Sequence, residues 1–169
     1  YSFEDDPDLW VLQRKSVSMD GDEVARAEFY PATAQVQHFY SYGQRKQTLT
    51  YNADGTVSTV TDGKNQITQL SNWYRGIPQN IAYHDLSSVS ALVNYEGWIT
   101  ETTDERLRVT SYHHDPMGRL DLITPPAPGA PTSILFAPNP SPAYGVIAGH
   151  WQQTVTRGDY RRITTFDAL

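Results

Sequence analysis

The sequence contains no cysteine, no long apolar run and very little helical periodicity. The absence of cysteine among its 169 residues excludes a disulfide framework and any metal site made of thiolates. No stretch approaches the roughly 18 apolar residues that a membrane-spanning helix needs. A formal net charge of −6 argues against the basic face of a nucleic-acid-binding protein. We therefore expect neither a membrane span nor a nucleic-acid partner.

Basic residues are scarce near the start of the chain. Residues 1–28 carry eight acidic side chains and only three basic ones. We interpret this region as a solvated acidic edge, because clusters of charge usually face water. The alternative is a calcium site in residues 4–8, Glu-Asp-Asp-Pro-Asp, but this run lacks the spaced ligands and the central glycine of a calcium-binding loop.

Threonine, valine, tyrosine, isoleucine and tryptophan, by contrast, occur in many short runs. These residues favour the pleated, half-buried surface of a β-strand. Turn residues separate the runs at intervals of roughly eight to twelve residues, which is typical of an all-β fold. We therefore expect an all-β protein of repeated antiparallel hairpins. The expected strands cover residues 11–17, 24–30, 48–51, 56–61, 66–70, 98–103, 107–112, 119–124, 133–136, 151–156 and 160–166.

Four glycines recur at every twenty-first position of the chain: Gly55, Gly76, Gly97 and Gly118. Three of them close a four-residue phrase that opens with Asn or Asp, at Asn52, Asn94 and Asp115. This pattern is typical of a type I turn, in which the short polar side chain bonds to the turn backbone and the glycine is left-handed. Such turns commonly close β-hairpins, so the pattern predicts a hairpin turn at each of these three places.

The residues that follow the glycines extend the repeat. An aliphatic residue stands two positions later, at Val57, Ile99 and Leu120. Seven positions after the glycine, Asp62 and Asp104 predict a second turn, and Pro125 fills the same place. Each repeat is therefore predicted to form strand, turn, strand and turn. The Gly76 repeat fits poorly, and we expect its second turn at Asp85, two residues late. A fixed period in this range indicates stacked units that need their neighbours to complete their packing.

Residues 112–120, Tyr-His-His-Asp-Pro-Met-Gly-Arg-Leu, resemble the YD repeat, whose core is Tyr-x-Tyr-Asp-x-x-Gly-Arg-aliphatic. His114 stands where the second Tyr of that motif belongs. Looser copies begin at Tyr51 and Asn94, and residues 166–169 look like the opening of a further copy that stops before its glycine. Residues 71–78 and 148–151 also look like spacers of bacterial RHS-repeat proteins. Because the first residue is Tyr1 and the last motif is incomplete, we expect a segment of a longer chain.

The resemblance implies a fold and a role. RHS/YD repeats form a long β-sheet that spirals into a hollow cocoon, which bacterial toxins use to enclose a variable C-terminal toxin domain; teneurins carry a related barrel. The resemblance implies a non-enzymatic wall segment, without a cofactor, in a bacterial protein that is secreted or displayed at the cell surface. Its partners would be the remaining repeats of the parent chain and the enclosed toxin domain. The repeat-motif residues are Tyr51, Asn52, Gly55, Gly76, Asn94, Gly97, Tyr112, Asp115, Gly118, Arg119 and Leu120.

A wall of paired hairpins also needs curvature and contacts between repeats. Curvature of a sheet comes from twist and from bulges, and we expect each repeated left-handed glycine to supply one bulge. We expect Tyr51, Tyr112 and Arg119 to stack or bond across neighbouring repeats.

The repeat divides the chain into four parts. Residues 1–47 are predicted to form degenerate hairpins, and residues 48–124 form the regular YD-repeat region. Residues 125–145 are a proline-rich insertion, in which we expect a loop or a sheet edge with one short strand, because proline cannot donate to a strand ladder. Residues 146–169 are expected to hold further strands and the truncated motif.

Two other classes of function stay open. Trp10, Trp73, Trp98 and Trp151 allow a carbohydrate-binding repeat module at the cell surface, with packing between strands as the simpler role of these rings. A hydrolase would need a pair of carboxylates across a cleft, for which Glu101 and Asp121 are conceivable.

Three further motifs have simpler interpretations. His113 and His114 cannot easily share a metal ion with Asp115, because adjacent strand residues point to opposite faces. The Asp-Pro-x-Gly phrase that begins at Asp115 resembles a self-cleavage motif of RHS proteins, but it continues into Arg119 as a repeat does. Residues 157–159, Arg-Gly-Asp, match an integrin-binding tripeptide and are expected to be a hairpin turn.

Overall fold

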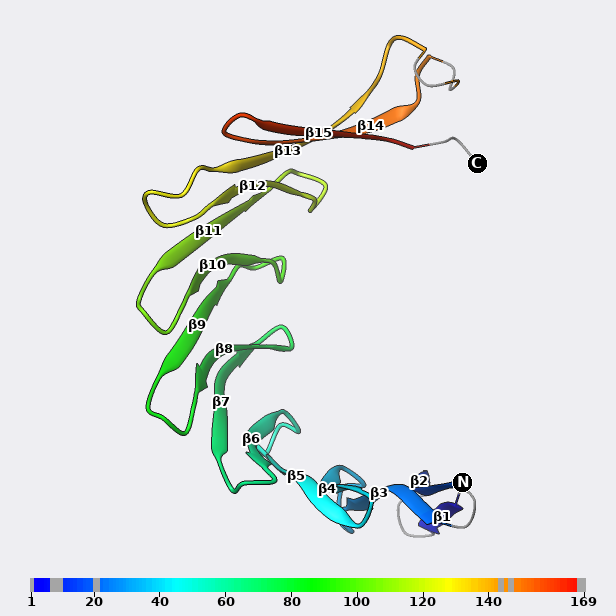
Figure 1. The fold of residues 1–169 in the computed structure, drawn as a ribbon. Helices are drawn as coiled ribbons and strands as arrows, with labels where there is room; N and C mark the ends of the chain where they lie inside the picture. The colour runs from blue at the N-terminus through cyan, green and yellow to red at the C-terminus, as the bar shows by residue number, and fades with distance from the viewer. Residues whose placement is uncertain (1, 7–10, 20–21, 143–144, 146–147, 167–169) are drawn as a thin grey trace. The chain divides into compact units, whose positions relative to one another are not determined.

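The computed structural model describes residues 2–6, 11–19, 22–142, 145 and 148–166, with side chains from residue 18 onward. Every regular element in these residues is a β-strand (Figure 1). No helix long and apolar enough to cross a membrane occurs in this described part.

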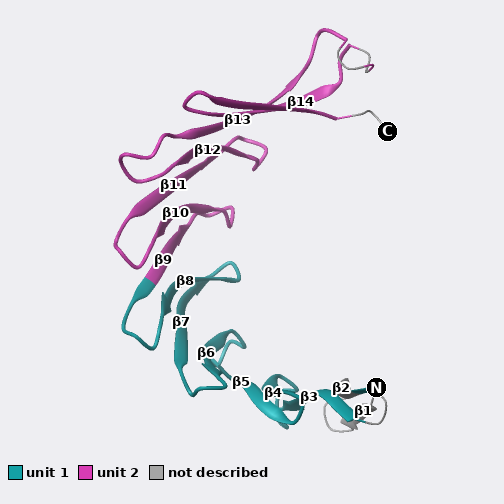
Figure 2. Ribbon diagram, in the orientation of Figure 1, with its two compact units in different colours: residues 1–88 teal, residues 89–169 magenta. Residues whose placement is uncertain are grey.

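The chain divides into two compact units, residues 1–88 and 89–169, coloured separately in Figure 2. In the described residues, unit 1 holds the strands β1 (Ser2–Asp6), β2 (Val11–Met19), β3 (Asp22–Phe29), β4 (Val36–Ser41), β5 (Gln44–Tyr51), β6 (Val57–Asp62), β7 (Ile67–Tyr74) and β8 (Ile77–Ala82). Unit 2 holds β9 (Ser88–Val93), which begins one residue before the boundary, β10 (Ile99–Thr103), β11 (Val109–His114), β12 (Leu120–Thr124), β13 (Thr132–Pro138), β14 (Trp151–Arg157) and β15 (Tyr160–Thr165).

Strands that follow one another in the chain pair antiparallel within each unit, from β1 to β8 and from β9 to β15. The predicted all-β fold of repeated antiparallel hairpins is confirmed. The expected strands match eleven of these elements with shifted ends, and they omit β1, β4, β8 and β9.

The sheets have almost no buried core. Among the described side chains, only Ala27, at 8% exposed, and His150, at 4%, are buried. Most globular domains bury one face of each sheet under a second layer. Here many strand residues are half-buried instead. Such a sheet needs few fully apolar positions, which agrees with a hydrophobic content of 38%.

Two expectations about turns are wrong. The second turn of the Gly76 repeat begins at Tyr83, because the Leu86 N–H donates to the Tyr83 carbonyl and the Tyr83 N–H donates to the Ser87 carbonyl. It therefore keeps the register of Asp62 and Asp104, and Asp85 is its third residue. Leu107, expected in a strand, is instead the last residue of a turn, with a φ of 60°, and β11 begins two residues later.

The proline-rich segment also differs from expectation. β13 pairs with β12 through Leu122–Ser133 and Ile123–Thr132, and it pairs with β14 along its whole length. It is therefore an interior strand of unit 2 and neither a loop nor an edge. The prolines are compatible with this position because Pro131 precedes the strand and Pro138 is its last residue.

Several predictions lie outside the described residues. These concern the side chains of the acidic run 4–8, Trp10, and residues 167–169 of the truncated motif.

Candidate functional site

The three glycine turns have the predicted backbone geometry. The opening side chain bonds to backbone N–H groups at Asn94 and Asp115, whereas the Asn52 amide donates to the Thr56 hydroxyl. In each turn the N–H of the glycine donates to the carbonyl of the opening Asn or Asp, and the φ angles of Gly55, Gly97 and Gly118 are 85°, 93° and 80°. The register of each hairpin shifts beside its turn, between β5 and β6, between β9 and β10, and between β11 and β12. The prediction of one bulge for each repeated glycine is confirmed at these three glycines. It is wrong at Gly76, where the β7–β8 hairpin keeps a single register.

The aliphatic residues two positions after these glycines open the following strands. Val57, Ile99 and Leu120 are the first residues of β6, β10 and β12, and all three are half-buried. The motif therefore places one apolar side chain at the start of the outgoing strand of each hairpin.

Asp115 and Arg119 lock the most complete YD motif. One carboxylate oxygen of Asp115 accepts the backbone N–H groups of Met117 and Arg119 at 2.9 and 3.0 Å. The other oxygen accepts Nε and Nη2 of Arg119, both at 2.7 Å. A bidentate arginine and two backbone donors therefore fix the turn at both ends.

The second turn of the Gly97 repeat uses the same lock. Asp104 Oδ1 accepts the N–H groups of Arg106 and Arg108, each at 2.9 Å, and Asp104 Oδ2 accepts Nε and Nη2 of Arg108 at 2.8 and 2.6 Å. Sequence analysis predicted the turn at Asp104 and missed the lock. The Asp-x-x-x-Arg spacing shared with Asp115 and Arg119 is the signal that could have found it.

Hydrogen bonds in these turns favour the charged form of the aspartates. The backbone N–H of Arg119, followed by its guanidinium, lowers the pKa of Asp115 below its ordinary value. The side chain of Arg108 is the main cause of the lowered pKa of Asp104. In unit 1, the Thr56 hydroxyl and N–H lower the pKa of Asp54. The carboxylates therefore act as turn anchors, which suits a structural role better than proton transfer.

Left-handed residues recur at both turns of each repeat, although the left-handed residue is a glycine in only one of the two turns. The seven positions 55, 65, 76, 86, 97, 107 and 118 all have positive φ, and the steps between them alternate between ten and eleven. Asn65, Leu86 and Leu107 are the left-handed residues of the second turns, at φ angles of 62°, 70° and 60°. Ala34, at 56°, extends the register of the glycines one repeat toward the N-terminus. Sequence analysis missed these positions because their residue types differ.

Gly76 keeps the register with a different turn. Tyr74 pairs with Ile77, so Arg75 and Gly76 form a two-residue loop, with φ angles of 51° and 79°. Two left-handed residues in a row are typical of a type I′ hairpin. The poor fit of this repeat to the motif is therefore confirmed in its backbone.

The tyrosines of the motif make the expected contacts between repeats only in part. The Tyr51 hydroxyl donates to the Val36 carbonyl at 2.8 Å, and its ring meets that of Tyr30 edge to face at 6.0 Å, so Tyr51 joins neighbouring repeats. Burial raises the pKa of the Tyr51 phenol. The Tyr112 hydroxyl reaches only the adjacent strand, at 3.2 Å from Thr102 Oγ1.

Trp98 fills the space between the start of β10 and the end of β11. Its ring centroid lies 5.2 Å from that of His114, the last residue of β11. A Cβ atom on Gly118 would lie 2.6 Å from Cζ2 of Trp98, a distance that real contacts do not reach. Gly118 is therefore required twice, by its left-handed backbone and by the tryptophan ring against it.

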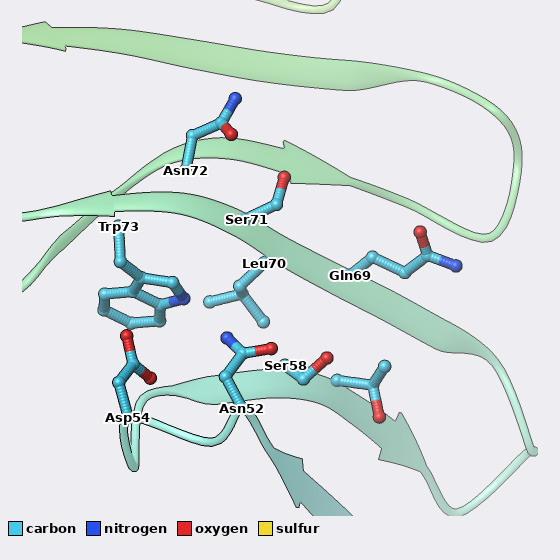
Figure 3. Close-up of a pocket in the computed structure, with 9 residues that line it drawn as sticks. Asn52, Asp54, Ser58, Gln69, Leu70, Ser71, Asn72 and Trp73 are labelled. Atoms are coloured by element: carbon cyan, nitrogen blue, oxygen red, sulfur yellow. The ribbon is translucent and has the colours of Figure 1, made fainter.

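A groove of about 540 Å³ lies in unit 1, between the turn before β6 and the end of β7 (Figure 3). We call it the Trp73 groove; its lining residues are Asn52, Asp54, Ser58, Thr59, Gln69, Leu70, Ser71, Asn72 and Trp73. The Trp73 indole extends from β7 toward the opposite turn, and its N–H donates to the Val57 carbonyl at 2.9 Å. Asn72 has a φ of 54°, and the Gln79 amide donates to its carbonyl at 3.3 Å.

Of the other candidate residues, His113 is exposed, whereas Glu101 in β10 and Asp121 in β12 are half-buried. The His113 ring Nδ1 is 2.6 Å from Asp121 Oδ1, with 70% of the histidine side chain exposed. Among the described residues, no three His, Asp or Glu side chains lie close enough to hold a metal ion. Gly158 and Asp159 form the loop between the paired residues Arg157 and Tyr160, so the predicted hairpin turn is confirmed.

No protein-family model matches the chain, and no curated protein matches it either.

Proposed function

We propose that this chain is a structural wall segment of a YD-repeat shell that encloses a C-terminal toxin domain. The observation that carries this proposal is the strict alternation of left-handed turns, in steps of ten and eleven, from Gly55 to Gly118. An alternation of this kind lets successive hairpins be added to one sheet at a constant spacing along the chain.

The nearly absent core supports the same proposal. Described side chains are at most half-buried, apart from Ala27 and His150, so the sheet faces retain surface for contact with other parts of an assembly. A wall has such faces, which other parts of an assembly can cover. The proposed role is non-enzymatic, in a bacterial protein secreted or displayed at the cell surface, and its partners are the other repeats and the toxin domain.

Limited proteolysis of the full-length parent protein tests the shell. We expect the C-terminal domain to resist a protease in the intact protein and to be cleaved rapidly when residues 1–169 are deleted. Equal cleavage rates in the two proteins would contradict enclosure. The matched control is the C-terminal domain expressed alone, which gives the rate without any shell.

A carbohydrate-binding repeat module is the second candidate function. The Trp73 groove favours it, because tryptophan beside amide and hydroxyl side chains is suited to sugars. A glycan array probed with the intact parent protein tests this function, and an array without any bound glycan would count against it.

A further inference from the structure

Two strand ladders, one in each unit, have identical registers. β6 and β7 pair through Thr59–Gln69, Val60–Thr68 and Thr61–Ile67. β10 and β11 pair through Glu101–Ser111, Thr102–Thr110 and Thr103–Val109, and each of these residues lies 42 positions after its counterpart. Both ladders stop after three pairs, so each leaves a space between the start of its first strand and the end of its second.

A tryptophan ring fills the space in unit 2, and a threonine occupies the same sequence position in unit 1. Trp98 stacks against His114 and closes over Gly118. The residue 42 positions earlier is Thr56, whose hydroxyl donates to Asp54 at 2.6 Å and accepts the Asn52 amide at 2.9 Å. Thr56 is thereby held to its own turn and does not line the Trp73 groove. The space is left to the side chains of the groove, among them the Trp73 indole, whose N–H donates to the Val57 carbonyl.

The lining of the Trp73 groove limits its ligand to a neutral or cationic molecule. It contains one carboxylate, Asp54, and no Lys, Arg or His. Asp54 Oδ1 is held by Thr56, whereas no other described residue donates a hydrogen bond to Oδ2. Unneutralised phosphates and carboxylates would therefore be repelled.

The shape of the space favours a ring with an apolar face and a polar edge. In unit 2 the corresponding space accepts an indole, which is flat and apolar on its faces. In unit 1, Trp73 and Leu70 offer apolar surface, while the side chains of Asn52 and Ser58 point into the same space from the opposite side (Figure 3). A pyranose ring presents C–H groups on its faces and hydroxyls around its edge, and these match the two kinds of lining.

We propose that the Trp73 groove binds one neutral pyranose ring of a saccharide in the space that Trp98 fills two repeats later. This inference gives the carbohydrate-binding proposal its site and its ligand class, and it does not depend on the shell. Asn52, Asp54 and Ser58 hydrogen-bond the sugar hydroxyls, and Trp73 stacks on one face of the ring.

Calorimetric titration of the full chain with maltose, cellobiose, lactose and chitobiose tests the site. We expect at least one of these disaccharides to bind saturably with a dissociation constant of about 1 mM, as suits a single open site. Galacturonate is the anionic control and should bind at least about tenfold more weakly, a difference of roughly 1.4 kcal/mol. Absence of saturable binding of every neutral disaccharide, or binding of galacturonate alone, would overturn the proposal.

A variant that fills the groove locates the site. Thr56→Trp places an indole where unit 2 has one and should weaken binding at least about tenfold. Lys64→Trp is the matched control, since it adds the same ring at the exposed turn at the other end of β6 and should leave binding unchanged. Ser58→Tyr repeats the test if circular dichroism shows that Thr56→Trp is not folded. Undiminished binding in a folded groove-filling variant would overturn this site while leaving carbohydrate binding elsewhere in the chain intact.

Discussion

The β6–β7 and β10–β11 ladders share a register and differ at their open ends. In unit 2 the space is occupied by Trp98, and the adjoining turn is locked by Asp115 and Arg119. In unit 1 the space is an open groove, and the turn beside it is held by Thr56 and Asp54, without an arginine. One backbone register therefore accommodates two different sets of side chains at its open end, with Trp98 before the first strand in unit 2 and Trp73 near the end of the second strand in unit 1.

The largest expected effect is that of Gly118→Ala, compared with Gly76→Ala. Both glycines are left-handed, at φ angles of 80° and 79°, so both variants should lose about 1 kcal/mol of local stability from the backbone. Only Gly118 faces a ring, at 2.6 Å from its added Cβ, which should raise the total loss to about 3 kcal/mol. Hydrogen exchange of the two hairpins in the full-length protein measures both losses.

The Trp98→Thr variant tests whether the ring causes the extra loss at Gly118, because it gives unit 2 the residue that unit 1 has at the corresponding position. There the cost of Gly118→Ala should fall to about 1 kcal/mol, as at Gly76. An unchanged cost in the double variant would show that Trp98 is not what requires the glycine.

A smaller effect is expected in the pH dependence of turn stability, which should differ between the Asp115 turn of unit 2 and the Asp54 turn of unit 1. The pKa of Asp115 is lowered, first by the backbone N–H of Arg119, so its ionised form stabilises the fold above the ordinary value of 3.8. This contribution is lost as the pH falls through the lowered pKa. Asp115→Asn should therefore weaken the β11–β12 hairpin at pH 7, and the difference from wild type should shrink below about pH 3.8.

Asp54→Asn is the comparison variant in unit 1. Asp54 is the third residue of its turn, and its pKa is lowered mainly by the Thr56 hydroxyl and not by an arginine. Its loss at pH 7 should be the smaller of the two and should not depend on salt, whereas added salt should reduce the loss at Asp115. Proton exchange rates measured by NMR across this pH range give both comparisons. Equal salt dependence in both variants would mean that the ion pair contributes nothing to its turn.

The smallest expected effect is on the stability of the second turns of the repeats, which end at Asn65 in unit 1 and at Leu107 in unit 2. Leu107 in unit 2 and Asn65 in unit 1 occupy the same left-handed position, and Leu107 is 80% exposed. Asn tolerates this conformation better than Leu, so Leu107→Asn should stabilise its turn by about 0.5 kcal/mol and Asn65→Leu should destabilise its turn by a similar amount. Hydrogen exchange in the two turns is again the measurement, and a loss of stability in Leu107→Asn would show that Leu107 makes a contact that offsets its strain.

Much of the repeat could be predicted from the sequence. The turns at Asn52, Asn94 and Asp115 were placed correctly because turn chemistry is local, and glycine marks a left-handed position by residue type alone. The turns that end at Asn65 and Leu86 share neither their opening residue nor their left-handed residue, so only the backbone reveals that they are equivalent. The role of β13 was predicted wrongly because prolines at the ends of a strand do not interrupt its ladder.

The Trp73 groove could not be predicted, because its lining comes from a turn and two strands whose spacing only the structure gives. Trp73 itself was noted as a candidate for stacking on sugars. Asn52 lies in the turn before β6, and Asn72 lies in β7. Both line the space that begins where the β6–β7 ladder ends. Thr56 stands where unit 2 has Trp98, and this difference is visible only when positions two repeats apart are compared.

The alternating spacing of the left-handed turns has a consequence for how such a chain can change in length. An insertion or deletion of one complete repeat brings each later turn back to an equivalent place, so all of the following hairpins keep their pairing and their faces. A smaller change within a strand has no such compensation, since a shift of a single residue exchanges the two faces of a sheet. Tandem duplication of a whole repeat in the gene is therefore the mildest way for evolution to lengthen this protein, and a duplicated copy is free to exchange the residue at the position of Thr56 or Trp98.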